Sequence, residues 1–203
     1  LIKNKGKIWE GRMTQKIRKI NYESMAPIVI PEHTIKPEAH HKESYTHHLE
    51  TPMTEDQLLM TLLASISESG LLAYNNSTTL KLMGHLKTQE LYRAITVVVE
   101  RHDSLRSTVS KDKTKLITHH SMCEEIHFFD FSNEKNKDNV LNGFFQAESL
   151  NAFDIEKSLF RVNIIKISPQ SHLLNITVHH IICDGVSVGI ILQDIEAFYS
   201  AFV

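Results

Sequence analysis

Cysteine is scarce in this sequence: two, Cys123 and Cys183, occur among 203 residues. Two thiols are too few for a disulfide framework, and neither belongs to a Cys-x-x-Cys pair that binds zinc or performs redox chemistry. Long apolar runs are missing too, since no stretch approaches the ~20 residues that span a bilayer and the N-terminus lacks the apolar core of a secretory signal. These absences predict a soluble protein of the reducing cytoplasm.

A strong net charge is also absent, because 22 basic and 24 acidic residues leave a formal charge of −2. Such a balance gives no overall field for nucleic acid or an anionic membrane, so any partner must be recognised locally. Hydrophobic residues make up 41% of the chain and charged residues 23%, which is typical of a globular domain with a real core. The chain begins with Leu1 rather than Met, which indicates that it was cut from something longer or processed.

Residues 1–52 differ in composition from the rest of the chain. Four of the five prolines lie there, and the first twenty residues hold seven basic side chains against the single acid Glu10. Proline at this spacing interrupts both helix and sheet. We predict a short basic helix or docking segment over 1–20, with a disordered tail as an equal alternative, and an extended linker over 24–52. One lobe then occupies 53–203.

From Thr54 onward the hydrophobic pattern becomes regular and predicts alternating helices and strands. The first helix opens with an N-cap threonine and places Leu58, Leu59, Leu62 and Ile66 on one face. Helices are predicted over 54–69, 88–102, 140–151 and 185–202, and strands over 77–86, 104–109, 114–120, 124–132, 159–167 and 171–180. This alternation indicates an α/β fold, or an α+β sandwich with helices packed on a sheet.

Two adjacent histidines, His179 and His180, end the apolar strand "HLLNITVHH". Strict alternation puts His180 on the apolar face of this strand and His179 on the opposite face. An imidazole on an apolar face is desolvated, which favours its neutral, basic form near pH 7. A neutral histidine with one unprotonated ring nitrogen is what general-base catalysis requires.

Asp184 and Gly185 follow where the strand must turn into the last helix. A carboxylate beside apolar residues needs a cation or several donors, because its desolvation otherwise goes uncompensated. Gly185 allows a backbone angle closed to other residues, or the close approach of a ligand. The simpler alternative is that the Asp-Gly pair only makes the turn and caps the helix.

The histidines have simpler alternatives as well. A histidine at a strand end is most often a surface residue or a hydrogen-bonded core residue. A metal site formed by His-x-x-x-Asp is a second alternative, but His179 and His180 point to opposite faces and do not easily meet one ion. Three further histidine pairs show that the chain is simply rich in histidine: His40-His41, His47-His48 and His119-His120.

"HHIICDG" (179–185) resembles the HHxxxDG signature of condensation domains of nonribosomal peptide synthetases, which share the fold of chloramphenicol acetyltransferase. "ERHDSLRSTV" (100–109) is similar to the family's RHxxLRTxF motif, and "FDIEKSLFRVNIIKI" (153–167) resembles its FDL…PLFR stretch. "TEDQLLM" (54–60) lies where SxAQxRLW belongs and keeps Gln57, although the arginine and tryptophan are lost. The resemblance covers about residues 50–203.

The resemblance implies an acyltransferase lobe of the chloramphenicol acetyltransferase type, with a mixed sheet flanked by helices. Two such lobes enclose a tunnel in the family, where an acyl or peptidyl donor and an aminoacyl acceptor meet and form an amide bond. Both substrates arrive on the phosphopantetheine of carrier proteins, so no cofactor is expected to bind the domain directly. The implied partners are carrier proteins, a C-terminal lobe and adjacent synthetase modules.

The resemblance also implies roles for individual residues. As the second motif histidine, His180 takes a proton from the amine or only positions it, while His179 is structural. Gly185 lies at the donor–acceptor junction in relatives, where a side chain would obstruct the tunnel. The motif aspartate, Asp184, is held in the family by an arginine of RHxxLR.

The candidates for that arginine here are Arg101, which is preferred, and Arg106. The sequence also departs from the family's usual "SDG" or "ADG", because Cys183 precedes the Asp-Gly pair. A nucleophilic role for this thiol is disfavoured, since the family chemistry needs no acyl-enzyme and interior cysteines are commonly inert.

The residues after position 50 amount to about half of a condensation domain, so the resemblance implies the first lobe only. Half a tunnel neither holds both substrates in line nor excludes water. We therefore expect the isolated chain to fold but to have little or no activity. The alternative function is a non-catalytic half-domain or docking fragment that binds a carrier protein or a neighbouring module. A free trimeric acyltransferase is a third alternative, which the RHxxLR match does not support.

Overall fold

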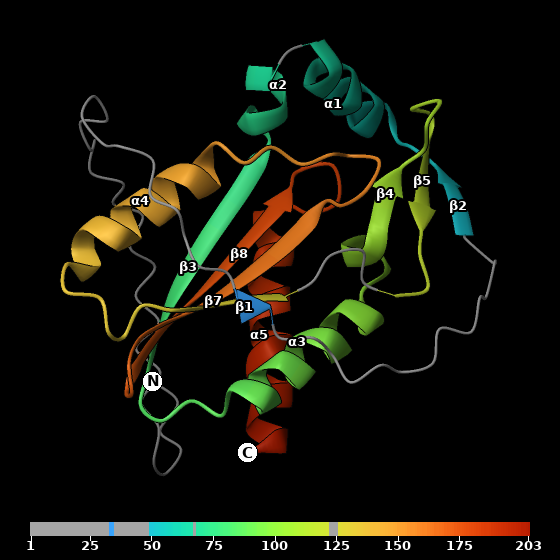
Figure 1. Ribbon diagram of the computed structural model, residues 1–203. Coiled ribbons are helices and arrows are strands. Elements are labelled where there is room, and N and C mark those ends of the chain that lie inside the picture. Colours follow the sequence, from blue (N-terminus) through green and yellow to red (C-terminus); the bar gives the residue numbers. More distant parts are fainter. Residues whose placement is uncertain (1–32, 35–48, 67, 122–125) are drawn as a thin grey trace.

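The computed structural model describes residues 33–34, 49–66, 68–121 and 126–203 (Figure 1). The basic helix or docking segment predicted over 1–20 lies outside the described residues. Among the described residues, no helix is both long enough and apolar enough to cross a membrane.

A mixed five-stranded sheet forms the centre of the fold, in the order β1-β6-β7-β8-β3. Strands β6 and β7 run parallel, whereas every other neighbouring pair is antiparallel. A second, three-stranded sheet has the order β2-β5-β4 and lies beside the first (Figure 1). The strands are β1 (His33–Thr34), β2 (Leu49–Pro52), β3 (Asn75–Met83), β4 (Ser107–Val109), β5 (Lys115–Thr118), β6 (Ile126–Asp130), β7 (Phe160–Ser168) and β8 (Ser171–His179).

Helices cover both faces of the five-stranded sheet. Helices α3 (Thr88–Arg101) and α5 (Gly185–Phe202) pack on one face and build the largest apolar cluster with β7 and β8. Helix α4 (Lys137–Ser149) packs on the other face through a smaller, phenylalanine-rich cluster. Helices α1 (Glu55–Ile66) and α2 (Glu68–Ala73) lie beyond the ends of β7 and β8 (Figure 1). The predicted mixed sheet flanked by helices is therefore confirmed.

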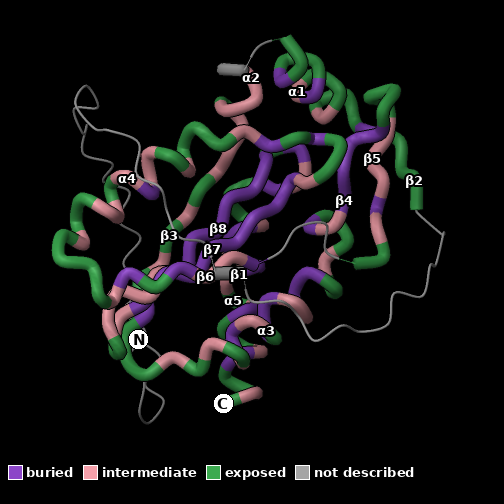
Figure 2. Tube along the Cα trace, in the orientation of Figure 1, coloured by how far each residue is buried: buried purple, intermediate pink, exposed green. Residues whose placement is uncertain are grey.

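Among the described residues, the hairpin of β7 and β8 is the most continuously buried part (Figure 2). Both strands are rich in β-branched residues, which suit a sheet covered on both faces. In α3, the four residues predicted to face inward are all 0–1% exposed: Leu91, Ile95, Val98 and Val99. Periodicity thus identified the elements that place the motif strand in the core.

Two segments differ from the sequence-based expectation. Residues 33–34 and 49–52, placed in the extended linker, form β1 and β2 and pair with β6 and β5. The segment over 104–109 begins as the 3₁₀ helix η1 (Asp103–Arg106) and becomes a strand only at Ser107. Local hydrogen bonding within the Asp-Ser-Leu-Arg turn explains the late start, because Ser107 Oγ–H donates to the carbonyl of Asp103 at 2.8 Å.

Helix α1 presents its apolar residues outward. The four residues expected on one helical face are 39–69% exposed, as is apparent from the exposed outer side of α1 in Figure 2. The helix instead packs through its small residues Thr61 and Ala64, which are 1% exposed. Met60 packs against the cluster beneath α1, which contains Met53 and Ile181. The spacing predicted the helix correctly, but not which side faces the protein.

Candidate active site

The motif that begins with the paired histidines spans the junction between β8 and α5. Strand β8 ends at His179, residues 180–182 form a turn, and α5 starts at Gly185. The two histidines therefore belong to different local structures. His179 is the last residue of the sheet, and His180 is the first residue of the turn.

His179 is completely buried, with 0% of its surface exposed. Its ring lies near those of Tyr74 and Phe153, at centroid distances of 6.1 and 6.4 Å. The Nδ1 atom accepts a hydrogen bond from the backbone N–H of Ile181 at 3.2 Å, so in the neutral ring the proton resides on Nε2. Burial, with a smaller contribution from the neighbouring His180, lowers the pKa of His179 to about 4. His179 is thus neutral at physiological pH.

His180 is exposed, so the prediction of a desolvated imidazole on an apolar face is wrong for this lobe. The alternation of faces holds only while the strand continues, and β8 ends one residue earlier. The backbone N–H of His180 donates to the carbonyl of Tyr74 at 2.8 Å. This bond anchors the backbone of His180 while its side chain faces outward.

Asp184 is also exposed, and it is the N-cap of α5. Its Oδ1 accepts from the backbone N–H of Ser187 at 2.8 Å and from the Ser187 hydroxyl at 2.6 Å. These hydrogen bonds hold the pKa of Asp184 below its ordinary value. The expectation of a buried carboxylate is therefore wrong. Of the two expected kinds of partner, a cation or several donors, the structure has the donors, and the capping alternative describes these contacts.

The expected arginine partner of Asp184 is wrong as well. Arg101 lies 3.6 Å from Asp194 on α5, and the adjacent His102 approaches the same carboxylate at 2.7 Å. Asp194 is ten residues along α5 from Asp184, which corresponds to about 15 Å along the helix axis. Arg106 instead donates to the side chain of Asp103 and to the carbonyl of His119.

Gly185 and Cys183 flank the aspartate. A Cβ added to Gly185 would meet no atom within 4 Å, and the glycine with positive φ among the described residues is Gly84 instead. A special backbone angle is therefore not the reason for Gly185. Cys183 is 4% exposed, and burial raises the pKa of its thiol to about 11. A thiol in that state is a poor nucleophile, as expected for an inert interior cysteine.

A glutamine from α1 holds the motif turn from the other side. Gln57 Nε2 donates to the carbonyl of Ile181 at 2.9 Å. The sequence showed that Gln57 is kept from a family motif, but it gave this side chain no role. The pattern Thr54-x-x-Gln57 is a capping-box signal, which predicts a bond within the helix end and not one to a turn 124 residues away.

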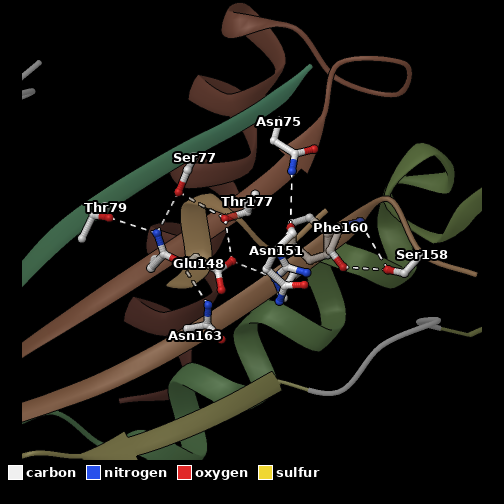
Figure 3. Close-up of polar contacts among 11 residues, drawn as sticks. Asn75, Ser77, Thr79, Glu148, Asn151, Ser158, Phe160, Asn163 and Thr177 are labelled. Carbon is white, nitrogen blue, oxygen red and sulfur yellow. Dashed lines mark hydrogen bonds and ion pairs between the residues drawn. The ribbon is translucent and has the colours of Figure 1, made fainter. Parts of the chain in front are cut away.

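A buried polar cluster beneath α4 was also missed (Figure 3). Arg161 on β7 donates to Glu148 on α4 at 2.7 Å, and the two side chains are only 6% and 10% exposed. Arg161 also donates to the carbonyl of Asn151 at 2.9 Å and lies over the ring of Phe153 at 4.7 Å. An arginine inside the apolar run "LFRVNII" was the available signal. The hydrogen bonds of this cluster continue to Ser77, Thr79, Asn163, Asn175 and Thr177.

The depressed pKa of His179 predicts that the chain loses stability in weak acid. Between pH 6.5 and about 4, His179 is mostly protonated in the unfolded chain and mostly neutral in the folded chain. The free energy of unfolding should fall over this window by about 3 kcal/mol and level off below it. Urea unfolding followed by circular dichroism from pH 7 to pH 4 measures this slope.

His179→Asn is the matched control for this prediction, because its amide oxygen still accepts from Ile181 and does not titrate. The pKa of His172 is lowered mainly by burial, and its contribution is present in both proteins. The difference between the two pH profiles therefore isolates His179. Equal slopes for the two proteins would show that its burial has no such effect.

Comparison with known protein families identifies relatives for most of the chain. The family model described as Condensation domain matches residues 48–203. A plipastatin synthase of Bacillus subtilis (strain 168) is 31% identical over 175 residues, which cover 84% of this chain and 4% of that protein. Surfactin synthase subunit 1 of the same strain is 31% identical over 152 residues, or 73% of this chain and 4% of that protein. The chain thus spans a small fraction of these relatives.

Solved structures share the fold at lower sequence identity. The starter condensation domain of rhizomide synthetase matches with a TM-score of 0.68 and 17% identity, over 75% of this chain and 39% of that one. The first condensation domain of the calcium-dependent antibiotic synthetase, in complex with a substrate analogue, matches with a TM-score of 0.66 and 17% identity. That match covers 76% of this chain and 38% of the solved chain.

Proposed function

This chain belongs to the condensation-domain family of nonribosomal peptide synthetases, and we propose that it supplies the HHxxxDG lobe for amide-bond formation. The donor is an acyl or peptidyl thioester on one carrier protein, and the acceptor is an aminoacyl group on another. The observation that carries the proposal is the geometry of the motif turn. Its backbone is held by hydrogen bonds to Tyr74, His179 and Gln57, while His180 is exposed, which supports its access to a substrate.

The proposed reaction needs one proton transfer near His180. The acceptor amine attacks the thioester carbonyl carbon, the C–N bond forms, and the C–S bond breaks with its electron pair going to a leaving thiolate. The amine loses a proton, which restores a neutral amide, and the departing sulfur gains one. We assign His180 either the acceptance of the amine proton or the positioning of the amine, because its imidazole is the exposed one of the pair.

The other motif residues support the turn in this proposal. Fully buried His179 holds the backbone after His180, and Asp184 fixes the start of α5 through Ser187. Arg101 and Arg106 act at a distance, by holding α3 to α5 and by bracing the segment before β4. For Gly185 we propose that a side chain would narrow the substrate tunnel between two lobes. In this lobe alone, a Cβ added at Gly185 would meet no atom within 4 Å.

The exposure of His180 also supports the proposal that a second lobe forms the other side of the site. The chain spans about two fifths of the condensation-domain chains that it matches in structure. We propose that a C-terminal lobe covers His180 and excludes water from the reacting groups, as orientation and desolvation require.

The proposed partners are carrier proteins and adjacent synthetase modules. The thioesters would reach the site on phosphopantetheine arms that belong to the carriers, so this chain holds no cofactor of its own in the proposal. A cytoplasmic location fits the free, buried thiol of Cys183.

Reconstitution tests the proposed function. The chain alone, incubated with a donor-loaded and an acceptor-loaded carrier protein, should yield little or no amide above background. The same residues joined to the C-terminal lobe of a related condensation domain should yield the carrier-bound amide, detected by mass spectrometry. Full-rate product from the chain alone would contradict the need for a second lobe. A folded two-lobe protein that binds carriers without forming product would favour the non-catalytic docking element.

A further inference from the structure

Two side chains hydrogen-bond to the backbone of Ile181, the residue that follows His180, one at its N–H and one at its carbonyl. The N–H of Ile181 donates to His179 Nδ1 at 3.2 Å, and its carbonyl accepts from Gln57 Nε2 at 2.9 Å. Its own side chain is 2% exposed and packs in the cluster beneath α1. These contacts to Ile181 therefore restrict the backbone conformation next to His180, and with it the direction of the His180 side chain.

The orientation of the Gln57 amide follows from its second contact. Gln57 Oε1 accepts from the backbone N–H of Thr54 at 3.0 Å, so the nitrogen end must face Ile181. The hydroxyl of Thr54 in turn accepts from the backbone N–H of Gln57 at 3.3 Å. An amide can accept one hydrogen bond and donate another at once, whereas an ionised carboxylate of the same shape can only accept.

We propose that Gln57 is a positioning residue for His180, a role that rests on the proposed function of His180 in amide-bond formation. The capping of α1 uses the oxygen end of the Gln57 amide alone. The nitrogen end crosses to a turn 124 residues away and fixes the carbonyl next to His180. Helix α1 and the catalytic turn are thereby joined through a single polar side chain.

Gln57→Glu separates the two ends of the amide. The carboxylate keeps the shape and can still accept from Thr54, but it cannot donate to Ile181. Its negative charge also faces the partly negative oxygen of the Ile181 carbonyl. Gln57→Met removes the donor without adding charge, so an effect common to both variants comes from the lost donor. Thr54→Ala is the matched control, because it removes the hydroxyl half of the cap and leaves both ends of the Gln57 amide in use.

Amide hydrogen exchange of the 203-residue chain, measured by NMR, tests the proposal without any substrate. Loss of one partly buried hydrogen bond corresponds to about a tenfold change in local opening, so exchange at His180 and Ile181 should accelerate by about tenfold in both Gln57 variants. Exchange at Ile176, inside β8, reports global opening and should change less. The His180 ring resonances should also shift or broaden in both Gln57 variants and remain in place in Thr54→Ala.

Two results would overturn the proposal. One is exchange at His180 and Ile181 that stays within about twofold of the wild-type rate in Gln57→Glu. The other is an equal acceleration in Thr54→Ala, which would show that Gln57 only caps α1. In the two-lobe protein, Gln57→Glu should lower kcat about tenfold and leave KM unchanged. If the wild-type two-lobe protein forms no amide, the proposed function fails, while the exchange rates still decide the role of Gln57.

Discussion

Replacing Arg161 by methionine should lower the free energy of unfolding by about 3–5 kcal/mol, because it leaves the buried carboxylate of Glu148 without a cation. The change also removes the donor to the Asn151 carbonyl and the guanidinium over Phe153. A loss of that size is a large fraction of the total stability of a natural domain. Urea unfolding of wild type and variant at pH 7 measures it.

A second variant separates the ion pair from packing. Arg161→Met combined with Glu148→Leu removes both charges, and the double variant should be more stable than Arg161→Met alone. The surface pair of Lys157 and Asp154 is the control, because Lys157→Met should leave the unfolding midpoint unchanged. A cost below about 1 kcal/mol for Arg161→Met would mean that Glu148 is solvated or neutralised in the folded chain.

Replacing His180 by alanine should lower the rate of amide formation in the two-lobe protein by about 10²–10⁴-fold, which is the range for loss of a general acid or base. Because His180 is exposed, the same change should leave the unfolding midpoint nearly unchanged. His85→Ala, at another exposed histidine, is the control and should affect neither quantity. Single-turnover formation of the carrier-bound product, followed by mass spectrometry, gives the rate.

His180→Gln distinguishes the two roles proposed for the imidazole. Glutamine can hydrogen-bond to an amine but cannot accept its proton at neutral pH. A rate as low as that of His180→Ala would assign proton transfer to His180, and a largely retained rate would assign positioning. A wild-type rate in His180→Ala would remove this histidine from the mechanism altogether.

Periodicity predicted the secondary structure well wherever one regular element continues. The inward residues of α3 and the long hairpin of β7 and β8 follow directly from spacing. The same rule failed at His180, because a two-residue period says nothing about where a strand ends. It also failed for α1, since the cluster beneath this helix receives its small residues and leaves the leucines outside.

Pairings between distant elements were the part that sequence could not supply. The motif resemblance pointed to Arg101 as a partner for Asp184, but the packing of α3 on α5 brings it to Asp194. Likewise, the arginine in β7 was visible as an anomaly, whereas its partner Glu148 is defined only when α4 crosses that face of the sheet. Which carboxylate pairs with an arginine depends on how distant elements pack, and the residues adjacent to the arginine in sequence do not reveal it.

The pairing of β3 with β8 has a consequence for synthesis of the chain on the ribosome. The partners in this ladder that lie nearest in sequence, Met83 and Ser171, are separated by 88 residues. At about 5–20 residues per second, β3 waits several seconds for the strand that completes its hydrogen bonds. Gln57 and Tyr74, two of the three residues that hold the backbone of the histidine turn, are synthesised earlier still. The turn that carries His180 is thus completed only after most of the described elements have been synthesised.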